Sequence, residues 1–222
     1  MLRVCLVGPG DTLEYHYFEL LGLSKDKFEK EIDNIARILA EQNYEIVLVP
    51  DRGVSFEVAK KYKKYGGKKV VGLVPLSDKD FGVDHLKPYM EAKMGGKRIF
   101  DEFIDTGNWY KQDLIHCILG DVVLVLGYSL GSLGELVYGL YLYKVFVGNK
   151  PEVKIPREKI HPQVRAGKTV PYSVIVYEPF VKGHLNYEIE GYIKKLGARV
   201  YYVKNLEELE EILREFKTLV RD

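Results

Sequence analysis

The sequence has few of the residues that hold small secreted proteins and metal sites together. Its 222 residues include two cysteines, Cys5 and Cys117, which lie far apart and lack the spacing of a disulfide framework or a ligand pair. We therefore expect both to be small buried hydrophobic residues of a cytoplasmic protein. The five histidines show no H-x-x-x-H spacing, so we expect no metal site and no cofactor.

The sequence also has no excess of charge and no long apolar run. Its 33 Lys and Arg residues almost balance its 32 Asp and Glu residues, which leaves a net charge of +1. This balance gives no electrostatic reason to expect nucleic-acid binding. No apolar run approaches the roughly 20 residues that span a bilayer, and residues 1–11 read as a strand rather than a signal peptide. We therefore expect no membrane partner. The abundance of Lys, Glu and Tyr resembles the composition of hyperthermophile proteins.

Short apolar runs alternate with helical patterns along the chain. Such runs, rich in β-branched residues, are typical of strands that are buried on both faces of a parallel sheet. They lie at 2–8, 45–50, 68–75, 121–126, 173–179 and 198–204. The alternation predicts an α/β fold with three α/β/α layers, an open, mainly parallel sheet and right-handed crossovers, that is, one Rossmann-like domain over 1–222. Two segments lack this periodicity and are interpreted as insertions: 77–106 and 148–171. The first of them could hold a strand, a short helix or a lid.

Three helices between these runs can be placed from their own residues. In the stretch 25–42, Phe28, Ile32, Ile35 and Leu39 fall on one face, and Ser24 stands at the N-cap position. Asn205 is the expected N-cap of the last helix. The helix over 135–146 is apolar on most sides, which predicts a homodimer or a higher homo-oligomer built on this surface.

Three glycine-containing loops follow predicted strands. The first contains Gly8, Pro9, Gly10 and Asp11, the second contains Gly53, and the third is GYSLGS at 127–132. In open parallel sheets the ligand crevice lies at the carboxyl ends of the strands. We therefore expect these loops to form one pocket.

The stretch GYSLGSLGE at 127–135 joins an apolar strand to an apolar helix. If the helix begins at Ser132, the N–H groups of its first turn have no partner within the helix and favour an anion such as phosphate. Gly131 lets the anion approach, Ser132 can add a hydroxyl, and Leu133 can add an N–H group. Anion binding does not explain Glu135, which could be a helix-start residue or could face a ribose beside the phosphate.

This stretch resembles the motif P-G-G-x-G-T-x-x-E of the SLOG superfamily of Rossmann-like nucleotide-binding proteins. Gly131, Ser132 and Glu135 match the last Gly, the Thr and the Glu, and Gly127, Tyr128 and Ser129 stand where the family has Pro-Gly-Gly. Residues 4–11, 47–75 and 173–179 agree in order, so the resemblance covers most of the chain. It implies a nucleoside monophosphate or phosphoribosyl ligand. It also implies that Glu135 acts on an N-glycosidic bond, as in the Lonely Guy phosphoribohydrolases, while Tyr128 narrows the pocket or stacks on a base.

The sequence departs from this family at one catalytic position. Lonely Guy enzymes carry an Arg-Lys pair on the helix before the motif strand, where this chain has Gln112 and Asp113. Glutamine cannot replace a guanidinium without loss. Two interpretations therefore remain open: an enzyme acting through Glu135, or a binding or sensing module that has lost catalysis. A dehydrogenase is disfavoured because no third glycine follows Gly8 and Gly10 at the required spacing. The third alternative is a purely structural homo-oligomer. We interpret His116 as a core or partner-facing residue.

Overall fold

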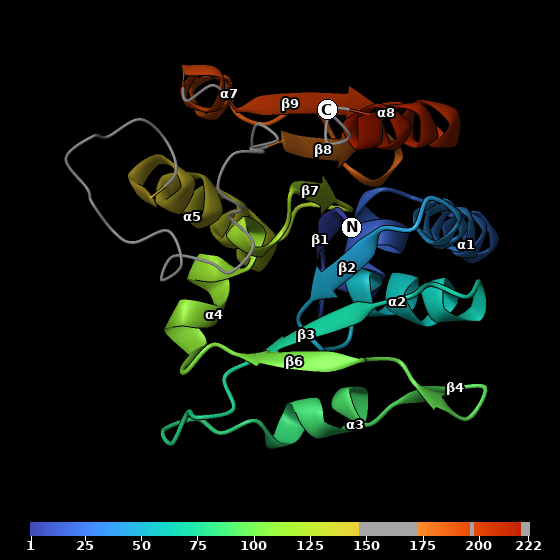
Figure 1. Ribbon diagram of the computed structural model, residues 1–222. Coiled ribbons are helices and arrows are strands. Elements are labelled where there is room, and N and C mark those ends of the chain that lie inside the picture. Colours follow the sequence, from blue (N-terminus) through green and yellow to red (C-terminus); the bar gives the residue numbers. More distant parts are fainter. Residues whose placement is uncertain (147–172, 196–197, 219–222) are drawn as a thin grey trace.

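A seven-stranded sheet, parallel throughout, is the centre of the molecule (Figure 1). The computed structural model describes residues 1–146, 173–195 and 198–218. The strand order is β6-β3-β2-β1-β7-β8-β9. These strands are β1 Arg3–Val7, β2 Glu45–Leu48, β3 Val70–Val74, β6 Glu102–Asp105, β7 Val122–Val125, β8 Ser173–Tyr177 and β9 Arg199–Val203. The predicted α/β fold with a mainly parallel sheet is confirmed.

Helices cover both faces of the sheet and complete the three predicted layers (Figure 1). One face carries α1 Lys25–Glu41, α2 Val54–Lys64 and α8 Leu206–Thr218, and the other carries α4 Trp109–Ile115, α5 Leu130–Phe146 and α7 Tyr187–Lys195. The shorter elements are η1 Tyr15–Leu20, η2 Asp84–Leu86, α3 Lys87–Met90, η3 Cys117–Leu119, η4 Glu178–Phe180 and the hairpin of β4 Lys93–Met94 and β5 Lys97–Arg98.

Alternation along the strands divides the core into two halves. Val4 and Leu6 of β1 belong to the cluster under α1, α2 and α8, whereas Cys5 and Val7 belong to the cluster under α4, α5 and α7. Successive side chains of a strand point to opposite faces, so a strand between two helical layers is apolar on both faces along its central residues. Cys5 and Cys117 are buried and unbridged, as predicted.

The predicted helix signals are confirmed where they fall on described residues. The four residues predicted to form the apolar face of α1, Phe28, Ile32, Ile35 and Leu39, are buried. The Ser24 hydroxyl accepts the Lys27 N–H at 3.2 Å, and the Asn205 side-chain oxygen accepts the Glu208 N–H at 2.9 Å.

The segment 77–106 contains a sheet strand that the pattern did not resolve. Strand β6 pairs with β3 at the edge of the sheet. Its residues are half-buried or exposed, with Glu102 and Asp105 at its ends, so it lacks the apolar run that marks the inner strands. The other predicted insertion, 148–171, lies outside the described residues.

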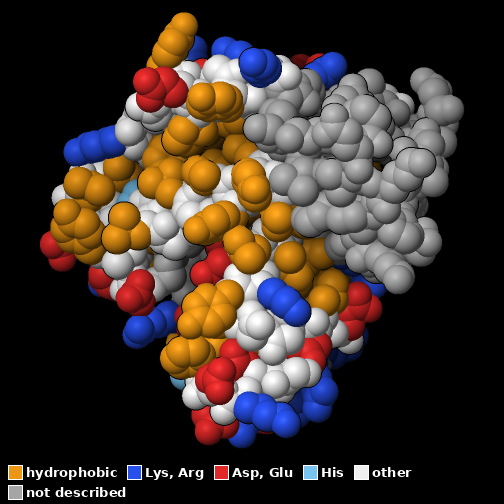
Figure 2. Space-filling view, turned by 90° about the vertical axis from the view of Figure 1, so that its left-hand side faces the viewer, with side chains coloured by type: hydrophobic (Ala, Val, Ile, Leu, Met, Phe, Trp, Pro, Cys, Tyr) orange, Lys and Arg blue, Asp and Glu red, His pale blue; other side chains and the backbone are white. Residues whose placement is uncertain are grey.

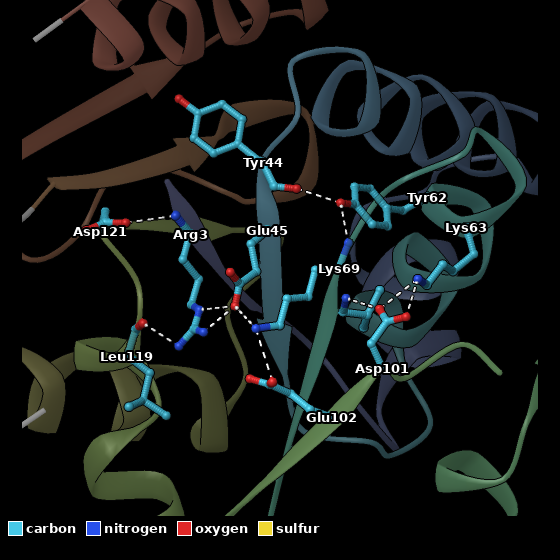
Figure 3. Close-up of polar contacts among 11 residues, drawn as sticks. Arg3, Tyr44, Glu45, Tyr62, Lys63, Lys69, Asp101, Glu102, Leu119 and Asp121 are labelled. Carbon is cyan, nitrogen blue, oxygen red and sulfur yellow. Dashed lines mark hydrogen bonds and ion pairs between the residues drawn. The ribbon is translucent and has the colours of Figure 1, made fainter. Parts of the chain in front are cut away.

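A charged network closes the amino-terminal end of the sheet (Figure 3). The Arg3 guanidinium is buried and binds the Glu45 carboxylate through Nε at 2.8 Å and also through Nη2. Lys69 lies 3.6 Å from Glu45 and 3.1 Å from Glu102, so it links β2 to β6. The Asp121 carboxylate accepts the Arg3 backbone N–H at 2.8 Å. These contacts fix the register of the strands at the end opposite the carboxyl-terminal loops.

The face that carries α4, α5 and α7 shows gathered hydrophobic side chains (Figure 2). Its exposed apolar residues include Val137, Tyr138 and Tyr141 of α5 and Tyr192 of α7. A groove of about 400 Å³ lies between the two helices. Within the described residues, no helix is both long and apolar enough to cross a membrane.

Candidate functional site

A cavity opens where the strand order reverses, between β1 and β7. At this switch point the loops after neighbouring strands lead to opposite faces of the sheet, which leaves a crevice at the carboxyl ends. The cavity has a volume of about 540 Å³ and is lined by the loops after β1, β2 and β7 and by α4. The predicted site residues that line it are Gly8, Pro9, Gly10, Asp11, Gly53, Ser129, Gly131, Ser132 and Glu135.

The loops after β1 and β2 meet closely on one wall of the cavity. The Val54 N–H donates to the Pro9 carbonyl at 3.1 Å. Gly53 has a φ of +129°, and a Cβ there would lie 2.5 Å from the Pro9 oxygen and 2.6 Å from the Gly10 Cα. Only glycine fits this position without moving the neighbouring loop. The predicted convergence of the two loops is therefore held by direct backbone contact.

Helix α5 begins at Leu130, two residues before the predicted start at Ser132. Ser129 caps it: the Ser129 hydroxyl accepts the Ser132 N–H at 3.1 Å, and the Ser132 hydroxyl accepts the Ser129 N–H at 2.6 Å. The Leu133 N–H donates to the Ser129 carbonyl at 3.0 Å. The N–H groups that lack a partner within the helix are therefore those of Leu130 and Gly131. The backbone N–H and the hydroxyl of Ser132 already take part in the cap.

Two predicted ligand residues are not among those that line the cavity. Tyr128 and Leu133 pack against the core cluster under α4, α5 and α7. Tyr128 follows Gly127, whose φ of +145° turns the chain where a Cβ would lie 2.7 Å from the Pro9 Cδ. The buried Tyr128 hydroxyl has no hydrogen-bond partner among the residues that the structure describes. A stacking role for Tyr128 against a ligand base therefore does not fit its position.

Glu135 forms a close pair with a buried histidine. The His116 Nδ1 lies 3.0 Å from the Glu135 Oε2, and the two side chains are 2% and 14% exposed. Burial acts most strongly on the pKa of His116 and lowers it. The charge of Glu135, the close contacts of the ring with Glu135 and with the Val47 backbone, and the charge of Asp113 outweigh burial, so the pKa is raised overall. The pair thus favours a protonated imidazole beside a carboxylate. The interpretation of His116 as a core or partner-facing residue agrees with its burial but did not foresee this pair.

Gln112 and Asp113 both line the cavity. Gln112 is 2% exposed, and its Oε1 has no hydrogen-bond partner in the described part of the chain. Burial and the charge of Glu135 raise the pKa of Asp113, and the charge of His116 opposes them. The position that the resemblance aligns with the arginine of Lonely Guy enzymes holds an uncharged amide, and one helical turn later His116, whose pKa is raised, lies beside Glu135.

The sequence reasoning also missed residues of the second loop and the start of α4. Asp51, Arg52 and Trp109 line the cavity. The sequence does carry a signal for Asp51 and Arg52, because they belong to the same loop after the second strand as Gly53, which is predicted to line the pocket. Among the described residues, no group of three or more His, Cys, Asp or Glu side chains is arranged to hold a metal ion.

Comparison with known proteins gives structural likeness alone. No family model matches the chain, and neither does any curated protein. A molybdenum cofactor binding protein from Rippkaea orientalis superposes with a TM-score of 0.56 at 15% identity, over 97% of both chains. The molybdenum cofactor carrier protein of Chlamydomonas reinhardtii gives 0.56 at 14% identity, over 98% of both. TM1055, a structural genomics target, gives 0.59 at 16% identity, over 97% of this chain and 99% of its own.

These matches extend over nearly the whole length of each partner, so the shared feature is the complete architecture rather than one βαβ unit. The architecture agrees with the fold that the resemblance seen in residues 127–135 implies. The chain is thus a Rossmann-like α/β protein with the fold that its resemblance to the SLOG superfamily implies.

Proposed function

We propose that the protein binds a nucleoside monophosphate or a related phosphoribosyl compound in the switch-point cavity. The observation that carries the proposal is the pair of N–H groups, of Leu130 and Gly131, at the cavity-lining start of α5. The positive end of a 17-residue helix favours an anion at this place.

A second helix and one cation support phosphate binding from the opposite wall. Helix α2 begins after Gly53, which gives it no side-chain cap, and its residue Ser55 lines the cavity. Arg52 is exposed at the same wall, where its guanidinium can pair with phosphate oxygens. The phosphate would therefore bind between two helix starts.

The catalytic form of the proposal assigns N-glycosidic cleavage to Glu135. One turn separates Gly131 from Glu135, about 5–6 Å, which suits a carboxylate that faces the ribose when the phosphate is at the helix start. Glu135 would stabilise positive charge that builds on the ribose or orient the attacking water. His116 would hold the carboxylate in place. The alternative is a binding or sensing module without turnover, because Gln112 provides no guanidinium.

The fold comparison supports a second candidate, a carrier for the molybdenum cofactor. Two of the matched structures bind or carry the molybdenum cofactor, and each matches this chain over at least 97% of its length. The same cavity would hold such a ligand, so the two candidates differ in the heterocycle and not in the place of binding.

The test of the proposal is calorimetric binding of a panel of nucleoside monophosphates and of inorganic phosphate. Gly131→Val places a branched side chain at the proposed phosphate position. Gly134→Val adds the same side chain on the same helix, outside the cavity, and is the control. Neither Cβ would lie within 3.8 Å of another group. We expect Gly131→Val to lose at least about tenfold in affinity, about 1.4 kcal/mol, and Gly134→Val to bind like the parent. Equal binding by both variants would contradict the proposed phosphate position.

Release of free base from the same panel separates the catalytic form from the binding module. If the parent releases base and Glu135→Gln binds but does not, Glu135 is catalytic. If the parent binds without releasing base, the binding module remains.

A further inference from the structure

We propose that the rim of the cavity carries a stacking platform for a planar aromatic ring of the ligand, and that this platform is the indole of Trp109. The inference rests on the proposed function and deepens it, because the ligand should then be a nucleotide with its base rather than a bare sugar phosphate. Trp109 takes the stacking role that the sequence pattern gave to Tyr128, whose side chain packs against the core.

The first observation is the position of Trp109. It is the first residue of α4, is half-buried and lines the cavity. Among the described lining residues it is the only Phe, Tyr or Trp. Gln112 and His116, three and seven residues later, line the cavity too, so one face of α4 follows its wall. Trp109 lies at the outer end of that face, because α4 begins after β6 at the carboxyl edge of the sheet.

The second observation is that the indole is already held in place. Its Nε1 donates to the Gly82 carbonyl at 3.1 Å, and the His85 ring stacks on it with the centroids 5.1 Å apart. The backbone N–H of Trp109 donates to the Asp78 carboxylate at 3.1 Å. An indole has no other hydrogen-bonding group, so what it offers to a ligand is apolar aromatic surface. Because this surface needs no ordering when a ligand binds, it favours affinity.

The proposed phosphate position lies at the same edge of the sheet. Helices α4 and α5 each follow a strand of the parallel sheet and pack against each other, so both begin at the carboxyl edge. Leu130, the first residue of α5, lines the cavity with a side chain that is 93% exposed. The rim between the two helix starts therefore has apolar side chains on both sides. A nucleotide whose phosphate binds the N–H groups of Leu130 and Gly131 can place its base against the start of α4.

The experiment compares ribose 5-phosphate with the monophosphates of adenosine, guanosine, cytidine and uridine. Trp109 is the single tryptophan of the chain, so tryptophan fluorescence reports on this position alone when it is excited at the red edge of the indole band, where the bases do not absorb. We expect at least one nucleotide to bind about tenfold or more tightly than ribose 5-phosphate, as stacking of a base on an aromatic side chain allows. That nucleotide should quench the fluorescence, whereas ribose 5-phosphate should bind without quenching it.

Two variants assign the preference to the aromatic face. Trp109→Phe and Trp109→Leu both lose the hydrogen bond to Gly82, and the phenylalanine keeps a face on which a base can stack. We expect Trp109→Phe to retain the preference for the nucleotide and Trp109→Leu to bind it no more tightly than ribose 5-phosphate. The control is Tyr110→Leu, at an aromatic residue that is 71% exposed and is not among the lining residues, which should bind like the parent. Urea unfolding of the ligand-free variants checks that Trp109→Phe and Trp109→Leu are folded alike.

The outcomes separate the two proposals. A parent that binds every nucleotide no more tightly than ribose 5-phosphate overturns this inference and leaves the phosphate site standing. A preference that survives in Trp109→Leu also overturns it, and so does equal quenching by ribose 5-phosphate. A parent that binds neither the nucleotides nor ribose 5-phosphate overturns the proposed function, and this inference with it.

Discussion

Replacing Glu135 by glutamine tests the pair at the centre of the cavity. The change keeps the size of the side chain and its capacity for a hydrogen bond, and it removes the charge that faces His116 at 3.0 Å. The groups that face the imidazole are then Asp113, whose charge raises the pKa of His116 less than Glu135 does, and the Val47 backbone. The Cys5 thiol, which donates to the His116 carbonyl at 2.9 Å, has a pKa raised by burial and stays neutral. Burial then dominates, so the pKa of His116 should fall.

The size of the effect follows from the kind of contact. Hydrogen bonds to charged groups contribute about 1.5–3 kcal/mol, which exceeds the effect of a helix-start carboxylate, about 0.3–1 kcal/mol. A raised folded-state pKa stabilises the protein most when the histidine is protonated in both states, below about pH 6.5. This contribution is lost as the pH rises through the folded-state pKa. The parent should therefore exceed Glu135→Gln in free energy of unfolding by about 1.5–3 kcal/mol near pH 6, and by less near pH 9.

The measurement is urea unfolding of parent and variant at both pH values, with the His116 ring followed by NMR titration. Glu211→Gln, at an exposed position of α8, is the matched control and should change the free energy of unfolding by less than about 0.5 kcal/mol at either pH. A difference between parent and Glu135→Gln that is the same at pH 6 and pH 9 would refute the protonated pair, and so would an unchanged His116 titration.

Three further predictions concern other parts of the molecule. Arg3→Met should lower the free energy of unfolding in urea by about 3–5 kcal/mol, because the buried Glu45 then has the more distant Lys69 as its cation. The double variant with Glu45→Leu should recover most of this loss. Equal losses in the single and the double variant would contradict a charge effect. Gly53→Ala should cost about 1–3 kcal/mol and weaken ligand binding, and Gly66→Ala, at positive φ with open space around it, should cost less and leave binding unchanged. The homo-oligomer remains a prediction from the exposed apolar face of α5 and α7; light scattering that gives a monomer at all micromolar concentrations would contradict it.

The fold could be predicted from the sequence because its signals are local and strong. Each inner strand is buried on both faces and is apolar apart from a first residue such as Arg3 or Glu45, and helices such as α1 and α8 show one apolar face. Strand β6 escaped prediction for the same reason: at the sheet edge its residues are half-buried or exposed, so nothing in its composition separates it from a loop.

The place of the site could also be predicted, since glycine-rich loops after parallel strands must meet at one edge of the sheet. One cavity is lined by most of the predicted residues: 8–11, Gly53, Ser129, Gly131, Ser132 and Glu135. What the local pattern could not predict is where each side chain points. The cap between Ser129 and Ser132 starts α5 two residues early, and the turn at Gly127 directs Tyr128 into the core.

The partner of Glu135 was decided by tertiary structure alone. His116 directly follows α4 and Glu135 lies on α5, 19 residues later, and only the packing of α4 against α5 brings them within 3.0 Å. The same packing turns Gln112 into the cavity and buries its amide. A sequence pattern records which residues share a face of one helix, whereas charge pairing and desolvation depend on what the facing helix places opposite. The sequence by itself thus determined the scaffold and the edge where a ligand can bind, and helix packing determined the chemistry found there.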